Sequence, residues 1–240
     1  MGQLIVTHIR ALTFDVFGTV VDWRGSILRE CQRLSEVDGI TTDWESFVDS
    51  WRYDGYIGGI QQVRSGEIPF QTTDSLHRLH LDKLLSERNI SLTEERTNYL
   101  NQSWHRLDPW PDTIGGLHRL RNKFVVATLS NGNISLLANM AKHAGIPWDC
   151  LLSAEITGAF KPDPECYKKA ALLLDCKPEE ILMVAAHKGD LLAAAEVGFK
   201  TAFIPRPLEA GPNQKIDLVP DPSFHYVAPN LHELATQLGC

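Results

Sequence analysis

Short apolar runs alternate with longer amphipathic segments along most of this chain. The apolar runs have the length and the β-branched and aromatic content of buried strands, and they fall at Ile9–Phe14, Phe124–Leu129, Cys150–Ala154, Ile181–Ala186 and Thr201–Ile204. Helical spacing is found between them, at Ile114–Asn122, Ile134–Ala144, Pro164–Leu174 and Leu191–Val197. This alternation predicts βαβ units, and so an α/β fold with a doubly wound, mostly parallel, Rossmann-like sheet.

The stretch between the first and second of these strands has a different pattern. It contains no strand-like run, but it has amphipathic segments at Ser26–Val37, Trp44–Val63, Thr72–Glu87 and Thr93–Trp104. A connection of this length is too long for a loop in a compact domain. We therefore predict an inserted helical cap at residues 23–108, hinged near residues 22–25 and 108–111. The α/β core then comprises residues 1–22 and 109–240.

The C-terminal part of the chain carries one further irregular segment. Pro205–Pro222 is rich in proline, which interrupts regular structure. We predict a surface excursion there, followed by a last strand near His225–Val227.

Composition and charge exclude several classes of protein. The 240 residues carry a net charge of -7, which argues against a general nucleic-acid binder. No apolar stretch approaches the roughly 18 residues that would span a membrane, and Met1–Ile5 lacks the basic and apolar blocks of a secretory signal. The net charge does not exclude an anionic substrate, because a few local Arg and Lys residues can set the field inside a pocket.

Cysteine usage indicates the compartment. Five cysteines are scattered along the chain without a CxxC pair, at Cys31, Cys150, Cys166, Cys176 and Cys240. An odd number without close pairs favours reduced thiols over disulfides or a zinc site. We therefore expect a cytoplasmic protein.

Four polar side chains follow the predicted strands at their carboxyl ends. Asp15 ends the first apolar run, Ser130 ends the second, Lys161 precedes a helix that begins with proline, and Asp190 follows the fourth run. Since the carboxyl ends of parallel strands share one edge of the sheet, the four side chains should converge. A buried carboxylate beside an ammonium can stay ionised and act as a nucleophile.

Each of these features has a plainer interpretation when it is taken alone. Ser130-Asn131-Gly132-Asn133 suits an anion at a helix N-terminus, but it equally suits a turn with an N-cap. A single lysine before a helix is usually a solvated charge, and Asp190 could merely cap a helix. His187 alone is more often structural than catalytic.

The order of these motifs, Asp-x-Phe-Gly-Thr, Ser-Asn-Gly, Lys-Pro-Asp and a final Asp, resembles that of the haloacid dehalogenase superfamily. Within it the chain is most similar to the type II L-2-haloacid dehalogenases. The resemblance covers nearly the whole chain, including the place of the cap. It implies hydrolytic dehalogenation of a short (S)-2-haloacid to the 2-hydroxy acid through an aspartyl ester, without a cofactor, and it suggests a homodimer.

The resemblance also implies roles for individual residues. Asp15 would be the nucleophile, with Lys161, Asp190 and Thr19 as the other catalytic residues. The remaining candidates would bind the substrate or the halide: Arg52, Ser130, Asn131, Phe17, Tyr167 and His187. On a helix, Arg52 alone would more often be a surface charge, and the functional role follows from the scarcity of other cations on the cap that could face the cleft.

A phosphatase is the main alternative. Phosphatases of this superfamily use Asp-x-Asp, whose second acid protonates the leaving group, and an acidic pair that holds magnesium. Here Phe17 stands in place of the second acid, and Ala186 in place of the first acid of the pair. A hard cation such as Mg²⁺ prefers oxygen ligands, so these replacements favour the dehalogenase. A third alternative is an inactive scaffold that binds a partner.

The chain departs from the type II pattern in the fourth motif. A serine, an asparagine and a tryptophan are expected where this chain has Ala185, His187 and Gly189. His187 could replace the asparagine as a hydrogen-bond donor, and its ordinary pKa of about 6.5 would make the rate sensitive to pH near neutrality. Tyr53 stands where an amide side chain is expected on the cap, so the sequence does not determine the shape of the halide pocket.

Overall fold

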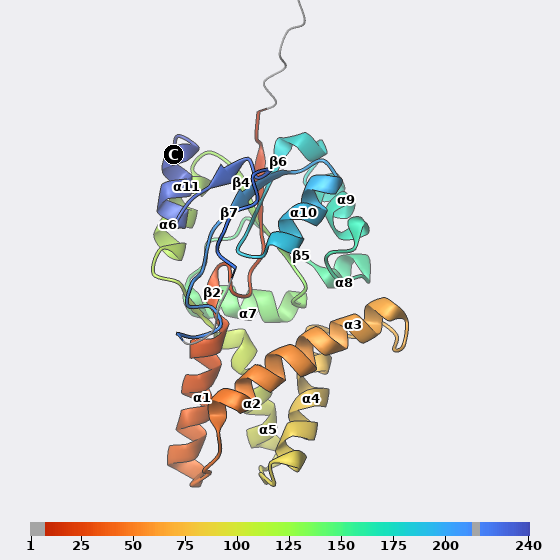
Figure 1. The fold of residues 1–240 in the computed structure, drawn as a ribbon, viewed down its shortest axis with the longest axis vertical. Helices are drawn as coiled ribbons and strands as arrows, with labels where there is room; N and C mark the ends of the chain where they lie inside the picture. Colours follow the sequence, from red (N-terminus) through yellow and green to blue (C-terminus); the bar gives the residue numbers. More distant parts are fainter. Residues whose placement is uncertain (1–7, 213–216) are drawn as a thin grey trace, which may run out of the picture.

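The computed structural model describes residues 8–212 and 217–240, and at its centre is a sheet of six parallel strands (Figure 1). The strand order is β5-β4-β1-β6-β7-β8. The strands are β1 (Ala11–Phe14), β4 (Val125–Ser130), β5 (Cys150–Ser153), β6 (Ile181–Ala185), β7 (Lys200–Phe203) and β8 (Tyr226–Val227). Every strand predicted for the core is present, with ends shifted by one or two residues. The parallel sheet is confirmed.

Both faces of the sheet are covered, which explains why its central strands are apolar throughout. Leu182 and Val184 of β6 pack on one side, whereas Ile181, Met183 and Ala185 pack on the other. Helices α6 (Thr113–Arg121), α7 (Ile134–Ala144) and α11 (Leu231–Gln237) contribute to the first core cluster, and α9 (Pro164–Leu173) and α10 (Lys188–Glu196) to the second. Figure 1 shows α6 and α11 on one side of the sheet, and α9 and α10 with the short α8 (Ala154–Thr157) on the other. A further single turn, η3, spans Pro178–Glu180.

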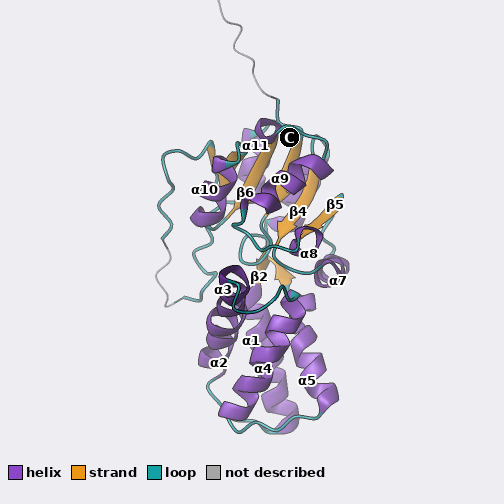
Figure 2. Ribbon diagram, turned by 90° about the vertical axis from the view of Figure 1, so that its right-hand side faces the viewer, coloured by secondary structure: helices purple, strands orange, loops and turns teal. Residues whose placement is uncertain are grey.

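The helical insertion forms the other half of the molecule (Figure 2). It consists of α1 (Trp23–Asp38), α2 (Trp44–Ser50), a π-helical segment η1 (Trp51–Ile57), α3 (Gly58–Ser65), α4 (Thr73–Glu87), α5 (Glu94–Asn101) and a 3-10 segment η2 (Gln102–Arg106). Short polar side chains begin four of these helices by accepting a hydrogen bond from a backbone N–H of the first turn, namely Asp22, Asp43, Thr72 and Thr93.

Two short strands that the sequence did not predict lie where the chain enters and leaves the helical half. β2 (Val21–Asp22) pairs antiparallel with β3 (Asp108–Pro109). The apolar pattern does not reveal them because each contains only two residues. The division into core residues 1–22 and 109–240 and cap residues 23–108 stays a prediction. If the division holds, the β2–β3 ladder is the hinge between core and cap.

The proline-rich segment is not a surface excursion along its whole length. Arg206, Glu209 and Ala210 are buried, and Arg206 binds Asp112 with both terminal nitrogens, at 2.7 and 2.9 Å. Its Nε also donates to the carbonyl of Thr19. The prediction is therefore wrong for Arg206, Glu209 and Ala210, because buried polar contacts can hold a segment inward without any regular structure.

Some predictions fall wholly or partly outside the described residues. These are the interpretation of Met1–Ile5, the first part of the core range and a part of Pro205–Pro222. Among the described helices, none has the length and apolar character needed to cross a membrane.

Candidate active site

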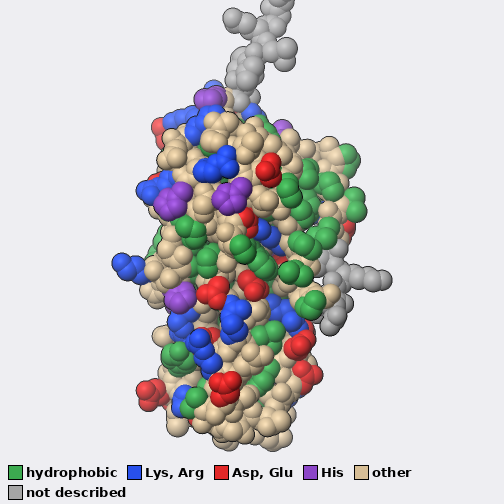
Figure 3. Space-filling model, turned by 90° about the vertical axis from the view of Figure 1, so that its left-hand side faces the viewer, with side chains coloured by type: hydrophobic (Ala, Val, Ile, Leu, Met, Phe, Trp, Pro, Cys, Tyr) green, Lys and Arg blue, Asp and Glu red, His purple; other side chains and the backbone are tan. Residues whose placement is uncertain are grey.

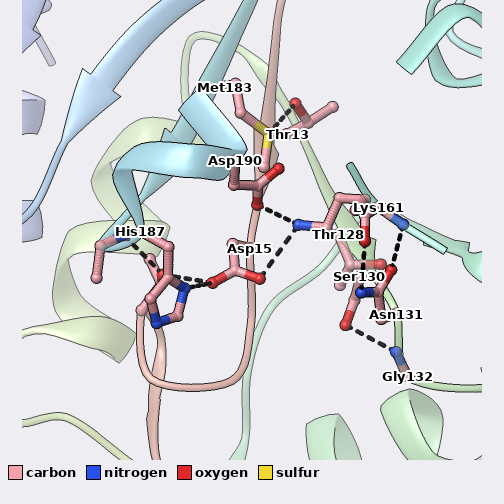
Figure 4. A network of polar contacts seen from close by, with 12 residues as sticks. Thr13, Asp15, Thr128, Ser130, Asn131, Gly132, Lys161, Met183, His187 and Asp190 are labelled. Atoms are coloured by element: carbon pink, nitrogen blue, oxygen red, sulfur yellow. Dashed lines mark hydrogen bonds and ion pairs between the residues drawn. The ribbon is translucent and has the colours of Figure 1, made fainter. Parts of the chain in front are cut away.

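Asp15 lies directly after β1, in the middle of the sheet and at its carboxyl edge. Its backbone N–H donates to the carbonyl of Val184 on the neighbouring β6, which fixes the position of the residue between β4 and β6. One side-chain oxygen, Oδ2, accepts a hydrogen bond from the Thr19 hydroxyl at 2.8 Å. The other, Oδ1, lies 3.1 Å from the Lys161 ammonium. Asp15 is thus held on both oxygens (Figure 4).

Lys161 lies between two carboxylates. Besides Asp15, its Nζ contacts Asp190 Oδ2, and Asp190 Oδ1 accepts a hydrogen bond from the Tyr167 hydroxyl at 2.5 Å. Lys161 precedes α9, Tyr167 lies on α9, and Asp190 lies in the first turn of α10. The prediction that groups from separate strand ends converge is therefore met in space by Asp15, Lys161 and Asp190.

Burial and neighbouring charges shift the pKa values of Asp15, Asp190 and Lys161. Burial by itself would raise the pKa of Asp15, but the Lys161 ammonium, with His187 and Thr19, holds that pKa well below its ordinary value. Burial raises the pKa of Asp190 despite the nearby ammonium. Burial opposes the charge on Lys161, and the two carboxylates outweigh it, so its pKa is raised. Asp15 is consequently ionised at neutral pH.

The loop after β4 positions Lys161 through its backbone. The Asn131 side chain accepts a hydrogen bond from the N–H of Lys161 at 2.7 Å and donates to its carbonyl at 3.3 Å. Ser130 is buried, and its hydroxyl accepts from the N–H of Gly132 at 3.1 Å. The carbonyl of Asn131 in turn accepts from Thr73 at the start of α4. This loop therefore links the lysine to the helical half of the protein.

His187 bridges Asp15 to a residue that sequence analysis missed. Its Nδ1 lies 2.9 Å from Asp15 Oδ2, and its Nε2 lies 2.9 and 3.1 Å from the two carboxylate oxygens of Glu209. Burial would lower the pKa of His187, but the hydrogen bonds and charges of the two carboxylates raise it to about 10. The ring is therefore an imidazolium at neutral pH.

Gly18 makes room for Glu209. It has φ +84, and a Cβ at this position would lie 2.0 Å from Glu209 Oε1 and 2.3 Å from its Cδ. Only a residue without a side chain allows both this backbone conformation and the close approach. The glycine of the first motif thus serves a carboxylate about 190 residues further along the chain.

We expect Gly18→Ala to lower the free energy of unfolding by about 2–4 kcal/mol, from backbone strain and from the displaced Glu209 hydrogen bonds. Gly39→Ala is the matched control, since Gly39 has φ +66 but nothing within 4 Å of a Cβ; it should cost only about 1 kcal/mol. Urea unfolding of the two variants measures the difference. Equal losses would show that Glu209 does not depend on Gly18.

Arg52 approaches from the helical half, on the π-helical segment. Its guanidinium carbon lies 4.7 Å from the ring centre of Tyr56, 5.1 Å from Trp23 and 5.6 Å from Phe17. Arg52 is buried, and its Nη1 has no hydrogen-bond partner within the described part of the chain. π-helical turns recur at functional sites, and this one presents a cation with a free donor.

A cavity of about 270 Å³ lies between the two halves of the protein. Its walls carry charged groups from both halves, and they comprise Asp15, Phe17, Arg52, Tyr56, Ile57, Asn131, Lys161, Pro162, His187, Gly189 and Asp190. The volume is near the lower end of ligand sites, so it suits a small molecule. A small anion could approach Arg52 on one side and Asp15 on the other.

The structure brings most of the sequence-predicted site residues to this cavity, but three lie behind its wall. Thr19, Ser130 and Tyr167 are buried and do not line the cavity; they bind groups that do, or the loop that carries them. Ile57, Pro162 and Glu209 were not predicted. Glu209 follows β7, so the rule on strand carboxyl ends applies to it, but it lies in a proline-rich segment that has no periodic pattern.

The donor groups do not fit a magnesium site. Ala186 replaces the first acid of the pair that would hold magnesium, and the Lys161 ammonium already contacts both Asp15 and Asp190. In the described residues, no three His, Cys, Asp or Glu side chains are grouped as metal ligands. We therefore derive no step through a metal.

The fold and this site define a known class of hydrolases. A family profile described as haloacid dehalogenase-like hydrolase matches residues 9–198, and the chain belongs to this family. The resemblance seen in the sequence motifs is confirmed.

Individual relatives are more specific. The crystal structure of the L-2-haloacid dehalogenase PA0810 is 45% identical, covers 96% of this chain and 98% of its own, and superposes with a TM-score of 0.93. A defluorinating L-2-haloacid dehalogenase is 41% identical over 97% and 96% of the two chains, also with a TM-score of 0.93. The (S)-2-haloacid dehalogenase of Xanthobacter autotrophicus is 32% identical over 210 residues, 82% of this chain and 76% of the relative.

Proposed function

We propose that this protein hydrolyses short (S)-2-haloacids to 2-hydroxy acids and halide, with Asp15 as the nucleophile. The names of its relatives support the reaction. The observation that carries the proposal is the arrangement in the cavity. The ionised, buried carboxylate of Asp15 lines the cavity together with Phe17, which stands in place of a second acid. Arg52 lines the same cavity, and its Nη1 has no hydrogen-bond partner among the described residues.

In the first step, an oxygen of Asp15 attacks the carbon that bears the halogen, in line with the bond that breaks. The halide leaves with the bonding electron pair, and the carbon is inverted. A halide needs no proton to leave, so this step does not require an acid at position 17, where the chain has Phe17. Arg52 lies where its free N–H can meet an anion, and its aromatic surroundings exclude water, which strengthens such a contact.

In the second step, water attacks the carbonyl carbon of the aspartyl ester. The bond between that carbon and the ester oxygen breaks, and the hydroxy acid leaves with this oxygen as its hydroxyl. One proton of the water ends on the product, and the other is released as Asp15 ionises again. Splitting one displacement into two steps is the advantage of a covalent nucleophile.

We propose that the reaction needs no metal. Lys161 supplies a positive charge at the nucleophile, because its Nζ lies 3.1 Å from Asp15 Oδ1 and contacts Asp190 as well. The phosphatase alternative requires a proton donor at position 17 and a magnesium ligand at position 186, and Phe17 and Ala186 supply neither. A binding scaffold remains the second alternative, and it predicts no turnover.

We expect (S)-2-chloropropionate to release chloride at the same rate with and without EDTA. Rapid acid quenching should trap a mass increment of one carboxyethyl group on the peptide that contains Asp15. (R)-2-chloropropionate is the matched control and should give neither product, because an asymmetric cavity orients the carbon–halogen bond of only one enantiomer in line with Asp15. Release that EDTA abolishes, or turnover of phosphate esters in place of chloroacids, would overturn the proposal.

Three finer statements also stay proposals. We propose a cytoplasmic protein, supported by five cysteines that are all free. We propose that it does not bind nucleic acid, which its acidic net charge supports. On the face drawn in Figure 3, acidic and basic side chains lie next to one another over the helical half. A homodimer is proposed only by analogy with the family.

A further inference from the structure

Asp15, His187 and Glu209 form a chain of carboxylate, imidazole and carboxylate. Each ring nitrogen of His187 faces carboxylate oxygen, Nδ1 toward Asp15 at 2.9 Å and Nε2 toward Glu209 at 2.9 Å. Ionised carboxylates only accept hydrogen bonds, so both ring nitrogens must carry a proton. His187 therefore donates to Asp15 whatever else occupies the cavity.

Glu209 is held in place from several directions. It is buried, and Oε1 accepts a second hydrogen bond from the indole N–H of Trp23, at 3.2 Å. Trp23 begins α1 in the helical half, whereas Glu209 belongs to the segment after β7. Gly18 leaves the space that the carboxylate fills. A buried acid with these contacts is positioned to orient the histidine.

The two oxygens of Asp15 have different surroundings. Oδ2 accepts from Thr19 and His187, at 2.8 and 2.9 Å, whereas the only side-chain polar contact of Oδ1 within the described residues is with the Lys161 ammonium. An oxygen with two donors is the poorer nucleophile, so Oδ1 is the atom that attacks carbon. Oδ2 then becomes the carbonyl oxygen of the ester, on which negative charge develops when water attacks.

We propose that Glu209 positions His187 as a hydrogen-bond donor to Asp15 Oδ2, and that His187 and Thr19 together stabilise the oxyanion formed when the aspartyl ester is hydrolysed. This inference rests on the proposed function. When water attacks the ester carbon, an electron pair moves onto Oδ2. The pair returns as the bond to Oδ1 breaks, and His187 keeps its proton throughout. Glu209 is a positioning residue, since it acts through His187.

The ester intermediate makes the role of Glu209 decisive. Alkylation removes the charge of Asp15, and the other charged residues that line the cavity with His187 are Arg52, Lys161 and Asp190, with Lys161 bound to Asp190. Glu209 is the carboxylate that still contacts the ring. It favours the protonated form and raises the pKa of His187, whereas the neutral ester no longer does so. The water step should slow as the pH rises through that pKa. Without Glu209 this slowing begins at lower pH.

Two substitutions of His187 separate its two contacts. Asparagine places an amide nitrogen on Cγ, where Nδ1 of the ring is attached, and keeps a donor to Asp15 while losing Glu209. Glutamine extends to the position of Nε2 and keeps the contact with Glu209 while losing Asp15. We expect His187→Gln to slow the water step about 10²–10³-fold, as for other lost oxyanion donors, and His187→Asn to stay within about tenfold of the wild type.

The measurement separates alkylation from hydrolysis. The first turnover of (S)-2-chloropropionate releases chloride, and quenched-flow mass spectrometry follows the decay of the ester on Asp15. His187→Gln should give a chloride burst followed by a long-lived ester. His187→Asn should hydrolyse the ester with no dependence on pH between 7 and 10. Equal ester decay in both variants would overturn the inference, whereas a wild type that releases no chloride would instead refute the proposed function.

Glu209→Gln tests the positioning role. In the wild-type background, the rate of ester decay in Glu209→Gln should begin to fall at a pH at least one unit lower than in the wild type. At pH 9 this rate should be about tenfold lower than that of the wild type. In the His187→Asn background, Glu209→Gln should have no further effect, because an amide does not titrate. An equal loss in both backgrounds would mean that Glu209 is merely structural. Should His187→Asn not fold, the titration of the His187 ring by NMR in the wild type and in Glu209→Gln decides, and identical curves would contradict the inference.

Discussion

We expect Asp15→Asn to lower the rate of halide release by at least about 10³-fold, as for the loss of other covalent nucleophiles. An amide is neutral and a far weaker nucleophile than a carboxylate of the same shape. The substitution keeps the size of the side chain and an oxygen that can accept from Thr19, and Lys161 keeps Asp190 as its partner. Chloride release and the mass of the Asp15 peptide are the measurements, and no increment should form.

Asp43→Asn is the matched control for this change. Asp43 is exposed and caps α2 by accepting from the N–H of Ser46, and asparagine caps helices equally well. Halide release should therefore be unchanged in this variant. Residual activity of Asp15→Asn above a few per cent of wild type, with an increment on another residue, would identify a different nucleophile. A protein that binds a partner without turnover would lose nothing at Asp15.

We expect Lys161→Met to be the second most damaging change, both for activity and for stability. Methionine has a similar length but no charge, so Asp15 and Asp190 would remain as two buried carboxylates without their cation. Removing one partner of a buried ion pair lowers the free energy of unfolding by about 3–5 kcal/mol. The rate should fall about 10²–10³-fold at neutral pH, because a stabilising charge at the reacting atoms is lost.

The pH dependence of this variant follows from the direction of the pKa shift. In the wild type the pKa of Asp15 is lowered, so the stability that its charge contributes is present above the ordinary pKa of about 4 and disappears only as the pH falls through the lowered value. Burial raises that pKa once Lys161 no longer opposes it. The acid limb of kcat/KM should therefore move toward neutral pH, and part of the activity should return at higher pH.

Lys168→Met is the control for Lys161→Met. Lys168 lies on α9 as an exposed partner of Glu165, and exposed pairs of this kind contribute little to stability. Its thermal midpoint and its pH profile should match those of the wild type. A Lys161→Met protein with the wild-type acid limb would show that another group keeps Asp15 ionised, and His187 would then be the candidate.

The sequence by itself predicted the parallel sheet and the place of the nucleophile. β1 and β6 are buried on both faces, so their apolar runs are continuous and easy to find. Asp15, Lys161 and Asp190 follow strands whose carboxyl ends share an edge, and this rule of topology brings them together without any knowledge of distances. The order of the motifs along the chain indicated the family.

Other parts of the site have no signal along the chain. Trp44–Val63 is one amphipathic pattern, and nothing in its spacing distinguishes the π-helical turn of Trp51–Ile57 from ordinary helix. That turn nevertheless carries Arg52 and Tyr56. Likewise, β2 and β3 are too short to give a period, although they join the two halves of the molecule.

The pair formed by His187 and Glu209 was decided by the tertiary structure alone. Glu209 belongs to a segment without periodicity, and it reaches the site because Arg206 binds Asp112 and because Gly18 leaves space for the carboxylate. Local sequence determines which residues begin and end strands, since backbone hydrogen bonding and burial repeat along the chain. Contacts between irregular segments do not repeat, so only the folded chain shows which carboxylate holds the histidine.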